Sequence, residues 1–337
     1  MVSAIFSEPV AAPEGICAEP ELTLELLISS REEQVPGIVV LELVDPDGGA
    51  LPSFDAGAHV DLQVSPGVIR QYSLCGNPAD RNIYRLGVLL DPASRGGSAG
   101  IHERFHPGSR IRIGRPRNLF PLAADASRSV LIGGGIGITP IIAMAHHLHG
   151  AARDFTLHYC ARARDKAAFL REFDESGFRD RVNVHFDDRP APERFDVARD
   201  LPPPAPDIHL YVCGPDGFMA WIIAEAIRLG YREQQIHREY FKAGIDTSGE
   251  AFEVLLARSN RRIKVPAEST IVEALSSAGV KVATSCAEGI CGTCLCTVLS
   301  GIPDHRDVYL TDEEKTANDQ ILLCCSRSKT PQLVLDL

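Results

Sequence analysis

Short apolar or alternating runs fill the first part of the chain, and turn residues separate them. Clusters of proline, glycine and aspartate end these runs, as they do between the strands of a small antiparallel sheet. Residues 20–125 are therefore predicted to form an antiparallel β-barrel or sandwich. The clearest predicted strands are residues 38–44, 59–64, 84–90 and 110–113.

From about residue 126 the apolar runs alternate with segments of helical periodicity. Strands that alternate with helices are typical of βαβ units, so residues 126–242 are predicted to form an α/β domain with a parallel sheet. The predicted strands are residues 130–132, 155–159, 182–186 and 208–212, and the predicted helices are residues 140–149, 166–173 and 217–229.

A small polar stretch over residues 243–250 has the composition of an interdomain linker. The segment that follows, residues 251–337, begins with two predicted strands and a helix over residues 270–278. One face of that helix is apolar, which indicates that it packs on a sheet. The chain is thus expected to be multidomain, with three folded domains after an N-terminal extension of residues 1–19.

Length and composition agree with this division. A chain of 337 residues is long enough for two or three domains, and 45% apolar with 23% charged residues is ordinary for folded globular protein. The net charge of −11 opposes nucleic-acid binding, and no apolar run approaches the roughly 20 residues of a membrane span. The first residues lack the features of a signal peptide, so we expect a cytoplasmic protein without membrane or nucleic-acid partners.

Six of the ten cysteines lie beyond residue 285, and their spacing indicates a metal centre. Cys286, Cys291 and Cys294 have the C-x4-C-x2-C spacing with which plant-type ferredoxins hold a [2Fe–2S] cluster. A fourth thiolate must come from farther along the chain, and Cys324 or Cys325 can supply it. A structural zinc site is the alternative, although zinc sites usually use pairs of closely spaced cysteines.

Glycines inside the cysteine loop favour the cluster, because a loop folded round a cluster needs tight turns and N–H groups directed at sulfur. They are Gly289 and Gly292. The segment resembles ferredoxin domains, in which a gap like the 29 residues between Cys294 and Cys324 is familiar. That resemblance implies Cys324 as the fourth ligand rather than its neighbour. Cys296 is interpreted as a small buried side chain.

The run from Arg70 to Leu74 ends one of the predicted barrel strands, and its side chains suit a flavin. An arginine can pair with a phosphate, the Tyr72 ring can lie against an isoalloxazine, and the Ser73 hydroxyl can bond flavin N5. The pattern R-x-Y-[ST] resembles the flavin-binding signature of the ferredoxin-NADP reductase superfamily. By composition alone the segment is only an amphipathic strand.

A second part of the expected flavin site is Gly96, Gly97 and Ser98, before a short predicted helix over residues 99–105. Glycines that lead into a helix N-terminus, with a serine able to cap, form an anion site. The alternative is an ordinary turn before a capped helix. The same resemblance implies that these residues hold the flavin phosphate together with Arg70.

A glycine-rich run, residues 133–140, follows a predicted strand and opens a predicted helix. Gly135 and Gly137 allow the backbone to approach a pyrophosphate, Thr139 can cap the helix and Pro140 suits its first turn. The run differs from the Rossmann pattern G-x-G-x-x-G. It resembles the G-x-G-x-x-P of the superfamily's pyridine-nucleotide domain.

Two further motifs resemble that nucleotide domain. Cys213, Gly214, Pro215 and Asp216 follow a predicted strand and are similar to the C-G-P motif, whose cysteine approaches the nicotinamide. A buried structural cysteine is the alternative for Cys213. Glu239 stands in a run similar to the superfamily's E-x-F ending.

The motifs occur in the order flavin, nucleotide and ferredoxin, and the Cys-Cys-Ser-Arg run follows. Together they resemble the phthalate dioxygenase reductase family, which includes vanillate demethylase reductases. The resemblance implies FMN in the barrel, NADH in the α/β domain, one [2Fe–2S] cluster in a β-grasp ferredoxin domain, and a Rieske-type oxygenase as electron acceptor. It implies that Ser73 orients flavin N5 and that Cys213 places the nicotinamide.

Several alternatives stay open. FAD could replace FMN, because no adenine pocket is recognisable. Arg162 and Arg164 could attract the 2′-phosphate of NADPH, whereas Asp165 would oppose it. The acceptor could be a soluble ferredoxin or a haem protein. The protein could also be a redox carrier or sensor without turnover, although a carrier has no need of a nucleotide domain.

Overall fold

The computed structural model describes residues 22–94, 96–241, 246–284 and 286–337. The expected N-terminal extension and the first residues of the expected linker, 243–245, lie outside this part of the chain. The described residues form two compact units, one before and one after the gap at residues 242–245. Each unit is considered by itself below.

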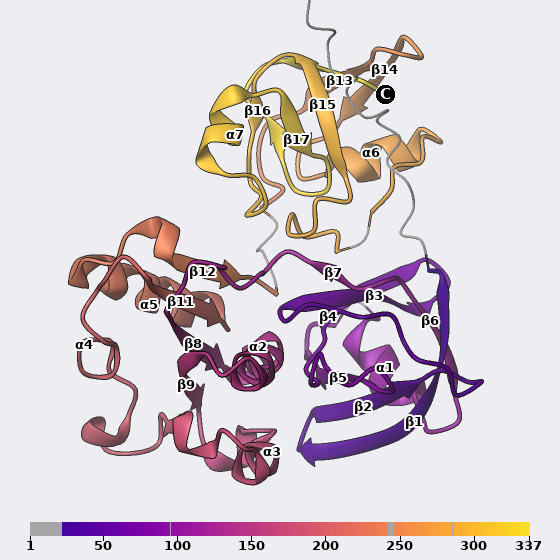
Figure 1. Ribbon diagram of the computed structural model, residues 1–337. Coiled ribbons are helices and arrows are strands. Elements are labelled where there is room, and N and C mark those ends of the chain that lie inside the picture. The colour runs from indigo at the N-terminus through magenta and orange to yellow at the C-terminus, as the bar shows by residue number, and fades with distance from the viewer. Residues whose placement is uncertain (1–21, 95, 242–245, 285) are drawn as a thin grey trace, which may run out of the picture. The chain divides into compact units, whose positions relative to one another are not determined.

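The first part of the earlier unit is the predicted antiparallel barrel (Figure 1). Its strands follow one another in the order β4-β3-β6-β1-β2-β5, and a bridge between Leu74 and Leu86 joins the two ends of this path. The barrel is therefore closed. Its elements are β1 (Leu24–Val35), β2 (Ile38–Val44), β3 (Ala58–Ser65), β4 (Val68–Ser73), β5 (Tyr84–Leu89), α1 (Ser98–Arg104), β6 (Arg110–Ile113) and β7 (Arg117–Asn118), which pairs with β3.

The second part of this unit is the predicted parallel sheet, with strand order β10-β9-β8-β11-β12. Its strands are β8 (Arg128–Gly134), β9 (Asp154–Ala161), β10 (Val182–Phe186), β11 (Ile208–Cys213) and β12 (Ile236–Glu239). Its α-helices are α2 (Ile138–Gly150), α3 (Leu170–Glu175), α4 (Val197–Asp200) and α5 (Asp216–Leu229). Its 3₁₀ turns are η1 (Gly135–Gly137), η2 (Arg164–Lys166), η3 (Arg179–Arg181), η4 (Ala191–Glu193) and η5 (Glu233–Gln235).

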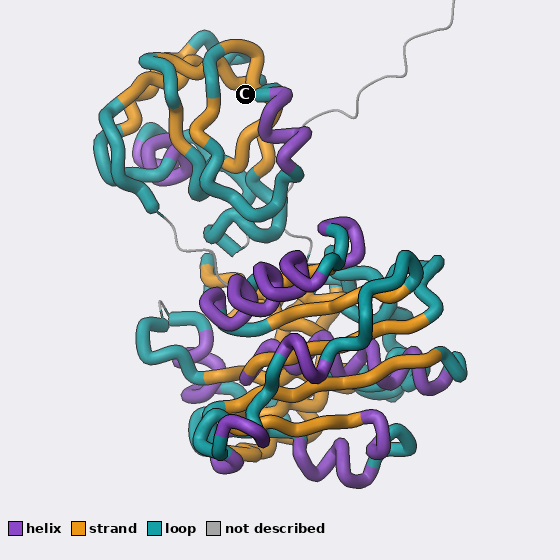
Figure 2. The backbone as a smooth tube through the Cα atoms, turned by 90° about the vertical axis from the view of Figure 1, so that its left-hand side faces the viewer, coloured by secondary structure: helices purple, strands orange, loops and turns teal. Residues whose placement is uncertain are grey.

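Alternation of side chains along the strands gives the sheet two apolar faces. Leu131 and Tyr211 pack with α2 in one core, whereas Val130 and Leu210 pack with α5 in another. Figure 2 shows helices on both faces of this sheet. The strand ends that carry the motifs are therefore held by two separate apolar layers.

The predicted helix over residues 166–173 is wrong at its start, because α3 begins only at Leu170. Phe169 has a left-handed backbone, with φ of 66°. Its N–H donates to Oε1 of Gln34 at 2.7 Å, and its ring lies where a side chain on Gly87 would have to be. These contacts with the barrel hold Phe169 out of the helix, and local periodicity carries no sign of them.

The later unit is an α+β fold with strand order β14-β13-β19-β15-β17. β13 and β19 are parallel and the other pairs are antiparallel. Thr270 caps α6 through a reciprocal bond with Glu273, as the sequence favours. The elements are β13 (Phe252–Leu256), β14 (Arg261–Val265), α6 (Ile271–Ser277), β15 (Leu295–Ser300), β16 (Pro303–Asp304), α7 (Asp312–Ala317), β17 (Gln320–Leu322), β18 (Arg327–Ser328) and β19 (Gln332–Leu335).

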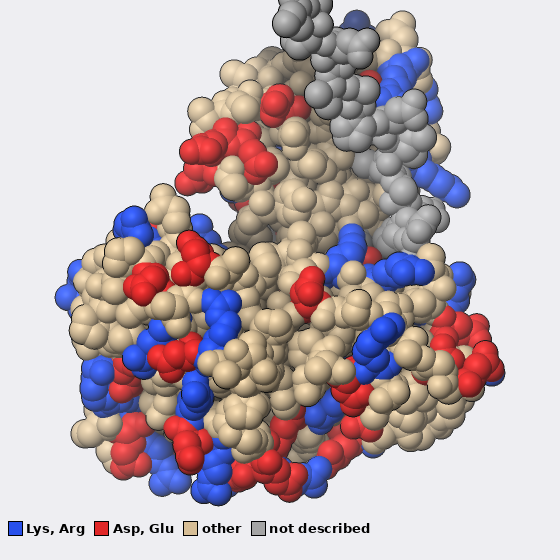
Figure 3. All heavy atoms as spheres, viewed as in Figure 1, with Lys and Arg blue, Asp and Glu red and all other residues tan. Residues whose placement is uncertain are grey.

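Charged side chains are distributed differently over the two units. In the unit before the gap, Lys and Arg alternate with Asp and Glu over the face in Figure 3. In the later unit the same view shows acidic side chains gathered over α7, whose first turn holds Asp312, Glu313 and Glu314. Within the described ranges, no helix is long and apolar enough to cross a membrane.

The Thr270 cap gives a first prediction. Thr270→Ala removes the acceptor for the N–H of Glu273 and should lower the free energy of unfolding of the later unit by about 1 kcal/mol. Thermal unfolding followed by circular dichroism measures this loss. Ser276→Ala, at an exposed position on the same helix, is the control and should leave stability within about 0.5 kcal/mol of wild type. Equal losses in the two variants would contradict a capping role.

Candidate functional site

Three predicted site residues meet where strands end. Ser73 ends β4, Cys213 ends β11 and Glu239 ends β12. The Ser73 hydroxyl donates to Oε2 of Glu239 at 3.3 Å, and Cys213 stands opposite Glu239 in the parallel register. The expected flavin motif of the barrel and the expected nicotinamide motif of the sheet thus lie next to each other.

This place is where the order of the parallel strands reverses. The chain forms β8, then β9 and β10 on one side, and then β11 and β12 on the other. In open α/β sheets, ligands bind outside the carboxyl ends of strands at such a switch point. The glycine run that ends at Pro140 follows β8, and the Cys-Gly-Pro run ends β11, so both motifs flank the expected crevice.

Burial changes the protonation of this group of residues. It raises the pKa of the Glu239 carboxyl to about 8, and the bond from Ser73 only partly opposes this. It also raises the pKa of the Cys213 thiol well above its ordinary value, with the nearby Glu239 adding to the effect. At neutral pH the thiol is therefore neutral, and the carboxyl is mostly protonated.

The two nucleotide motifs pack directly on each other. A Cβ on Gly137 would lie 2.5 Å from the carbonyl carbon of Cys213, and one on Gly134 would lie 2.7 Å from the Phe218 ring. Gly135 has a φ of 55° and no atom within 4 Å of where its Cβ would be. Packing thus requires glycine at positions 134 and 137, whereas the space next to Gly135 is open.

The expected cap by Thr139 is wrong. The N-cap of α2 is Gly137, and no described side chain caps this helix. Thr139 lies inside the first turn, so its hydroxyl reaches back and donates to the carbonyl of Ile136 at 3.0 Å. Its methyl group also lies against Gly87 of the barrel. Thr139 is therefore a buried contact between barrel and sheet.

In the second nucleotide motif, Pro215 is the N-cap of α5 and Asp216 is its first residue. Asp216 is exposed, and an acidic side chain in the first turn of a helix is favoured by the helix dipole. Gly214 packs against Gly134, because a Cβ there would lie 3.1 Å from the Gly134 Cα.

The two parts of the expected flavin-phosphate site come together. Arg70 lies on β4, and a Cβ on Gly97 would be 2.9 Å from both Cγ and Nε of Arg70. Gly97 is thus the residue over which the arginine side chain passes. The neighbouring Gly96 has a φ of 80°, which glycine adopts without strain.

Ser98 does not cap α1 as expected. The N-cap is Gly97, which has no side chain with which to cap the helix. The Ser98 hydroxyl instead accepts the N–H of Asp91 at 3.0 Å, and Ser94 accepts the N–H of Ala99 at 3.2 Å. These bonds hold the loop in front of Arg70.

The two remaining residues of the flavin motif differ in their surroundings. Burial raises the pKa of the Tyr72 phenol above its ordinary value, and the positive charge of Arg70 opposes the rise. Leu74 is buried, and its N–H donates to the carbonyl of Ala58 at 2.9 Å. Leu74 therefore closes the barrel, and Tyr72 stays a neutral ring beside the arginine.

The four predicted iron ligands are gathered and buried. The sulfur of Cys286 lies within hydrogen-bond reach of those of Cys291 and Cys324, and Cys324 in turn reaches Cys294. Backbone N–H groups also point at sulfur, with Gly289 donating to Cys324 at 3.2 Å and Glu288 donating to Cys286 at 3.3 Å. Four thiols with such donors fit a [2Fe–2S] cluster.

The geometry supports Cys324 over Cys325 as the fourth ligand. Cys324 contacts both Cys286 and Cys294, whereas the thiol of Cys325 lies 3.9 Å from the Leu322 carbonyl and 3.7 Å from the Ser326 hydroxyl. Cys296 is buried on β15 in the apolar core.

Sequence reasoning missed the residues that cover the cysteine loop. A Cβ on Gly292 would lie 2.4 Å from the Tyr309 ring, and one on Gly289 would lie 2.5 Å from the Cys325 sulfur. The Asp307 carboxylate accepts the N–H of Leu310 at 2.8 Å and holds this cover in a turn. No spacing rule predicts these contacts, although both glycines need positive φ.

Comparisons with known proteins agree with the two units. Residues 131–223 match the family described as oxidoreductase NAD-binding domain, and residues 254–329 match the 2Fe-2S iron-sulfur cluster binding domain. The second match contains the four cysteines and their cover.

Three individual proteins are similar over most of the chain. Vanillate O-demethylase oxidoreductase of Pseudomonas putida is 50% identical over 93% of this chain and 100% of its own length. The solved structure of phthalate dioxygenase reductase is 36% identical, with a TM-score of 0.74 over 95% of this chain and 100% of that chain. An intact type IV self-sufficient cytochrome P450 monooxygenase is 34% identical, with a TM-score of 0.81 over 98% of this chain and 43% of that chain.

The buried Glu239 carboxyl predicts a pH effect on stability. Its pKa is higher in the folded protein than in the unfolded chain, so the proton stabilises the fold. That stabilisation is complete below about pH 4.5 and is lost as the pH rises through about 8. The Gln side chain of Glu239→Gln stays neutral at every pH. Across this window the free energy of unfolding of wild type should therefore fall relative to that of the variant, by roughly a few kcal/mol.

Calorimetric Tm values of both proteins across that pH range test the expectation. Glu233→Gln is the matched control, because Glu233 lies just before β12 and pairs with Arg238 at 3.2 Å on the surface. A constant Tm difference between wild type and Glu239→Gln over the whole range would show that the carboxyl does not titrate there.

The adjacent cysteines give a matched pair of variants. Cys324→Ser should abolish most of the visible absorption of the cluster, because a ligand is lost. Cys325→Ser should retain the absorption, because its thiol bonds protein groups beside the cluster loop. Absorption spectra and iron content of the purified variants decide between them, and the reverse pattern would assign the fourth ligand to Cys325.

Proposed function

The chain belongs to the phthalate dioxygenase reductase family, and from this premise we propose that it passes electrons from NADH, through FMN and one [2Fe–2S] cluster, to a Rieske-type oxygenase. The observation that carries the proposal is that Ser73, Cys213 and Glu239 lie together at the switch point of the parallel sheet. The same chain also brings four thiols together in its later unit. A bound flavin takes two electrons with a hydride and releases them singly, as an iron–sulfur cluster requires.

The residues have separate tasks in this proposal. The Ser73 hydroxyl orients flavin N5, while the neutral thiol of Cys213 packs beside the nicotinamide. Glu239 holds a proton next to Ser73, which keeps negative charge away from the place where hydride moves. Arg70, with the N–H groups around Gly97 and Ser98, binds the flavin phosphate.

Two further assignments concern the nucleotide: where its pyrophosphate binds, and whether it carries a 2′-phosphate. The glycine run after β8, with Gly135 at its open position, takes the pyrophosphate. NADH is favoured over NADPH by membership of this family. Asp165, which stands beside Arg162 and Arg164 and pairs with Lys166 at 3.3 Å, adds a negative charge to this run. A carboxylate there opposes a 2′-phosphate.

The acceptor is inferred from the similar proteins. The relative that is 50% identical is named for vanillate O-demethylase, so we take an oxygenase that demethylates a methoxylated aromatic acid as the partner, in the cytoplasm. A haem protein is the second candidate, because the similar cytochrome P450 carries its reductase-like part in the same chain. Anaerobic mixing with each acceptor and timing of its reduction separates the two.

Cys291→Ser tests the order of the electron path. The variant should lose the cluster, so NADH-dependent reduction of a one-electron protein acceptor such as cytochrome c should fall to background. Reduction of ferricyanide, which can take electrons from the flavin directly, should stay within about twofold of wild type, because the flavin site lies in the other unit.

Two results would contradict this order. Full cytochrome c activity without the cluster would show that the cluster is not the exit. Loss of ferricyanide activity in a folded variant would show that the two units do not bind their cofactors independently. Cys296→Ser, at a buried cysteine outside the ligand set, is the control for replacing a thiol in this unit.

A further inference from the structure

Two arginines hold the segment by which the chain enters the cluster-carrying unit. We call residues 246–250 the entry segment. Arg306 donates to the carbonyl of Asp246, and Arg327 donates to the carbonyl of Glu250 at 2.9 Å. Both ends of the entry segment are thus attached to the same unit.

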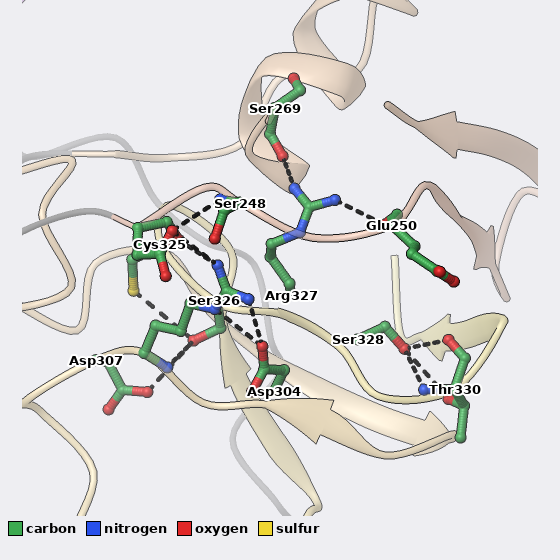
Figure 4. A network of polar contacts seen from close by, with 12 residues as sticks. Ser248, Glu250, Ser269, Asp304, Asp307, Cys325, Ser326, Arg327, Ser328 and Thr330 are labelled. Carbon is green, nitrogen blue, oxygen red and sulfur yellow. Dashed lines mark hydrogen bonds and ion pairs between the residues drawn. The ribbon is translucent and has the colours of Figure 1, made fainter. Parts of the chain in front are cut away.

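Arg327 is an internal anchor. Only 2% of its surface is exposed, and its guanidinium donates to the carbonyls of Ser269 and Glu250 (Figure 4). It also donates to the carbonyl of Pro266 at 3.1 Å. It also lies over the Phe252 ring, 5.2 Å from the ring centre. One planar cation therefore ties the entry segment to the start of β13 and to the turn before α6.

Arg306 forms the second attachment. Its Nε and one terminal nitrogen donate to Oδ2 of Asp304 at 2.9 and 2.6 Å, and its other terminal nitrogen reaches Asp246. Asp304 is paired with Arg327 across β16 and β18. The two arginines thus form one clamp around the entry segment.

Hydrogen bonds connect the clamp to the cysteine loop. The Ser326 hydroxyl accepts the N–H of Arg306 at 3.2 Å and donates to Asp307 at 3.4 Å. Asp307 packs against Gly289, and the next residue, Val308, donates to the Gly289 carbonyl at 3.2 Å. Figure 4 shows Ser326, Asp307 and Asp304 grouped beside Cys325.

We propose that Arg306 and Arg327 are positioning residues for electron delivery to the iron–sulfur site, because they fasten the entry segment to the loop that carries the cysteines. The inference rests on the proposed function. Electron transfer slows steeply as donor and acceptor move apart. A firm attachment leaves the cysteine loop few positions relative to the segment through which the chain enters this unit, whereas a loose entry segment leaves it many.

Arg306→Gln in the full-length holoprotein tests the proposal. After anaerobic mixing with NADH in a stopped-flow instrument, flavin reduction should keep its wild-type rate, while the following reduction of the cluster should slow about tenfold, as misplacement of reacting centres does. The visible absorption and the electron paramagnetic resonance of the reduced cluster should not change. Arg306→Lys should restore part of the rate, because an ammonium can reach one of the two acceptors.

Two further variants complete the design. Arg262→Gln makes the same change of charge in the same unit, where Arg262 pairs with Glu253 at 3.1 Å, and should leave both rates unchanged. Asp304→Asn weakens the hold on Arg306 without removing the arginine, and should slow cluster reduction less than Arg306→Gln does. It keeps the proposal testable if Arg306→Gln does not fold.

Three results are decisive. An unchanged rate of cluster reduction in both clamp variants would overturn the proposal. A changed resonance or lost absorption would also overturn it, because the arginines would then be maintaining the cysteine loop itself. If NADH reduces the flavin of wild type but never its cluster, the proposed function fails, and the clamp is not the cause.

Discussion

The close approach of two backbone loops at the carboxyl edge of the parallel sheet is the constraint on which the nucleotide site depends. Gly137 lies so near the carbonyl of Cys213 that no side chain fits between them. This contact fixes where β8 and β11 end relative to each other, and the register with β12 then places Glu239 opposite Cys213. The hydroxyl of Ser73 meets that carboxyl only because the barrel packs on the same edge.

The two cofactor sites are built by different means. At the sheet edge, the groups proposed to bind ligands come from four strands and two loops far apart in the sequence, so this arrangement exists only when the barrel and sheet are packed together. In the later unit, three of the four thiols come from a single loop, and its shape depends on glycines with positive φ. The first site is therefore a product of tertiary packing, and the second is largely local.

This difference explains what could be read from the sequence. The barrel, the parallel sheet and the cysteine loop were predictable because strand periodicity, βα alternation and cysteine spacing are local properties. The capping roles of Thr139 and Ser98 were wrong, because each residue lies inside the first turn of its helix rather than at the N-cap, and its hydroxyl bonds another backbone group. The left-handed Phe169 could not be predicted, because its bond to Gln34 joins residues of different domains. The domain limits and the individual ligand roles stay predictions.

The place of β19 has a consequence for biosynthesis. This strand lies in the middle of its sheet, between β13 and β15, and is formed by residues 332–335. Domains fold as they emerge from the ribosome, with N-terminal ones first. The barrel and parallel sheet can therefore assemble during translation, whereas the ferredoxin-like sheet cannot close until these late residues have left the exit tunnel.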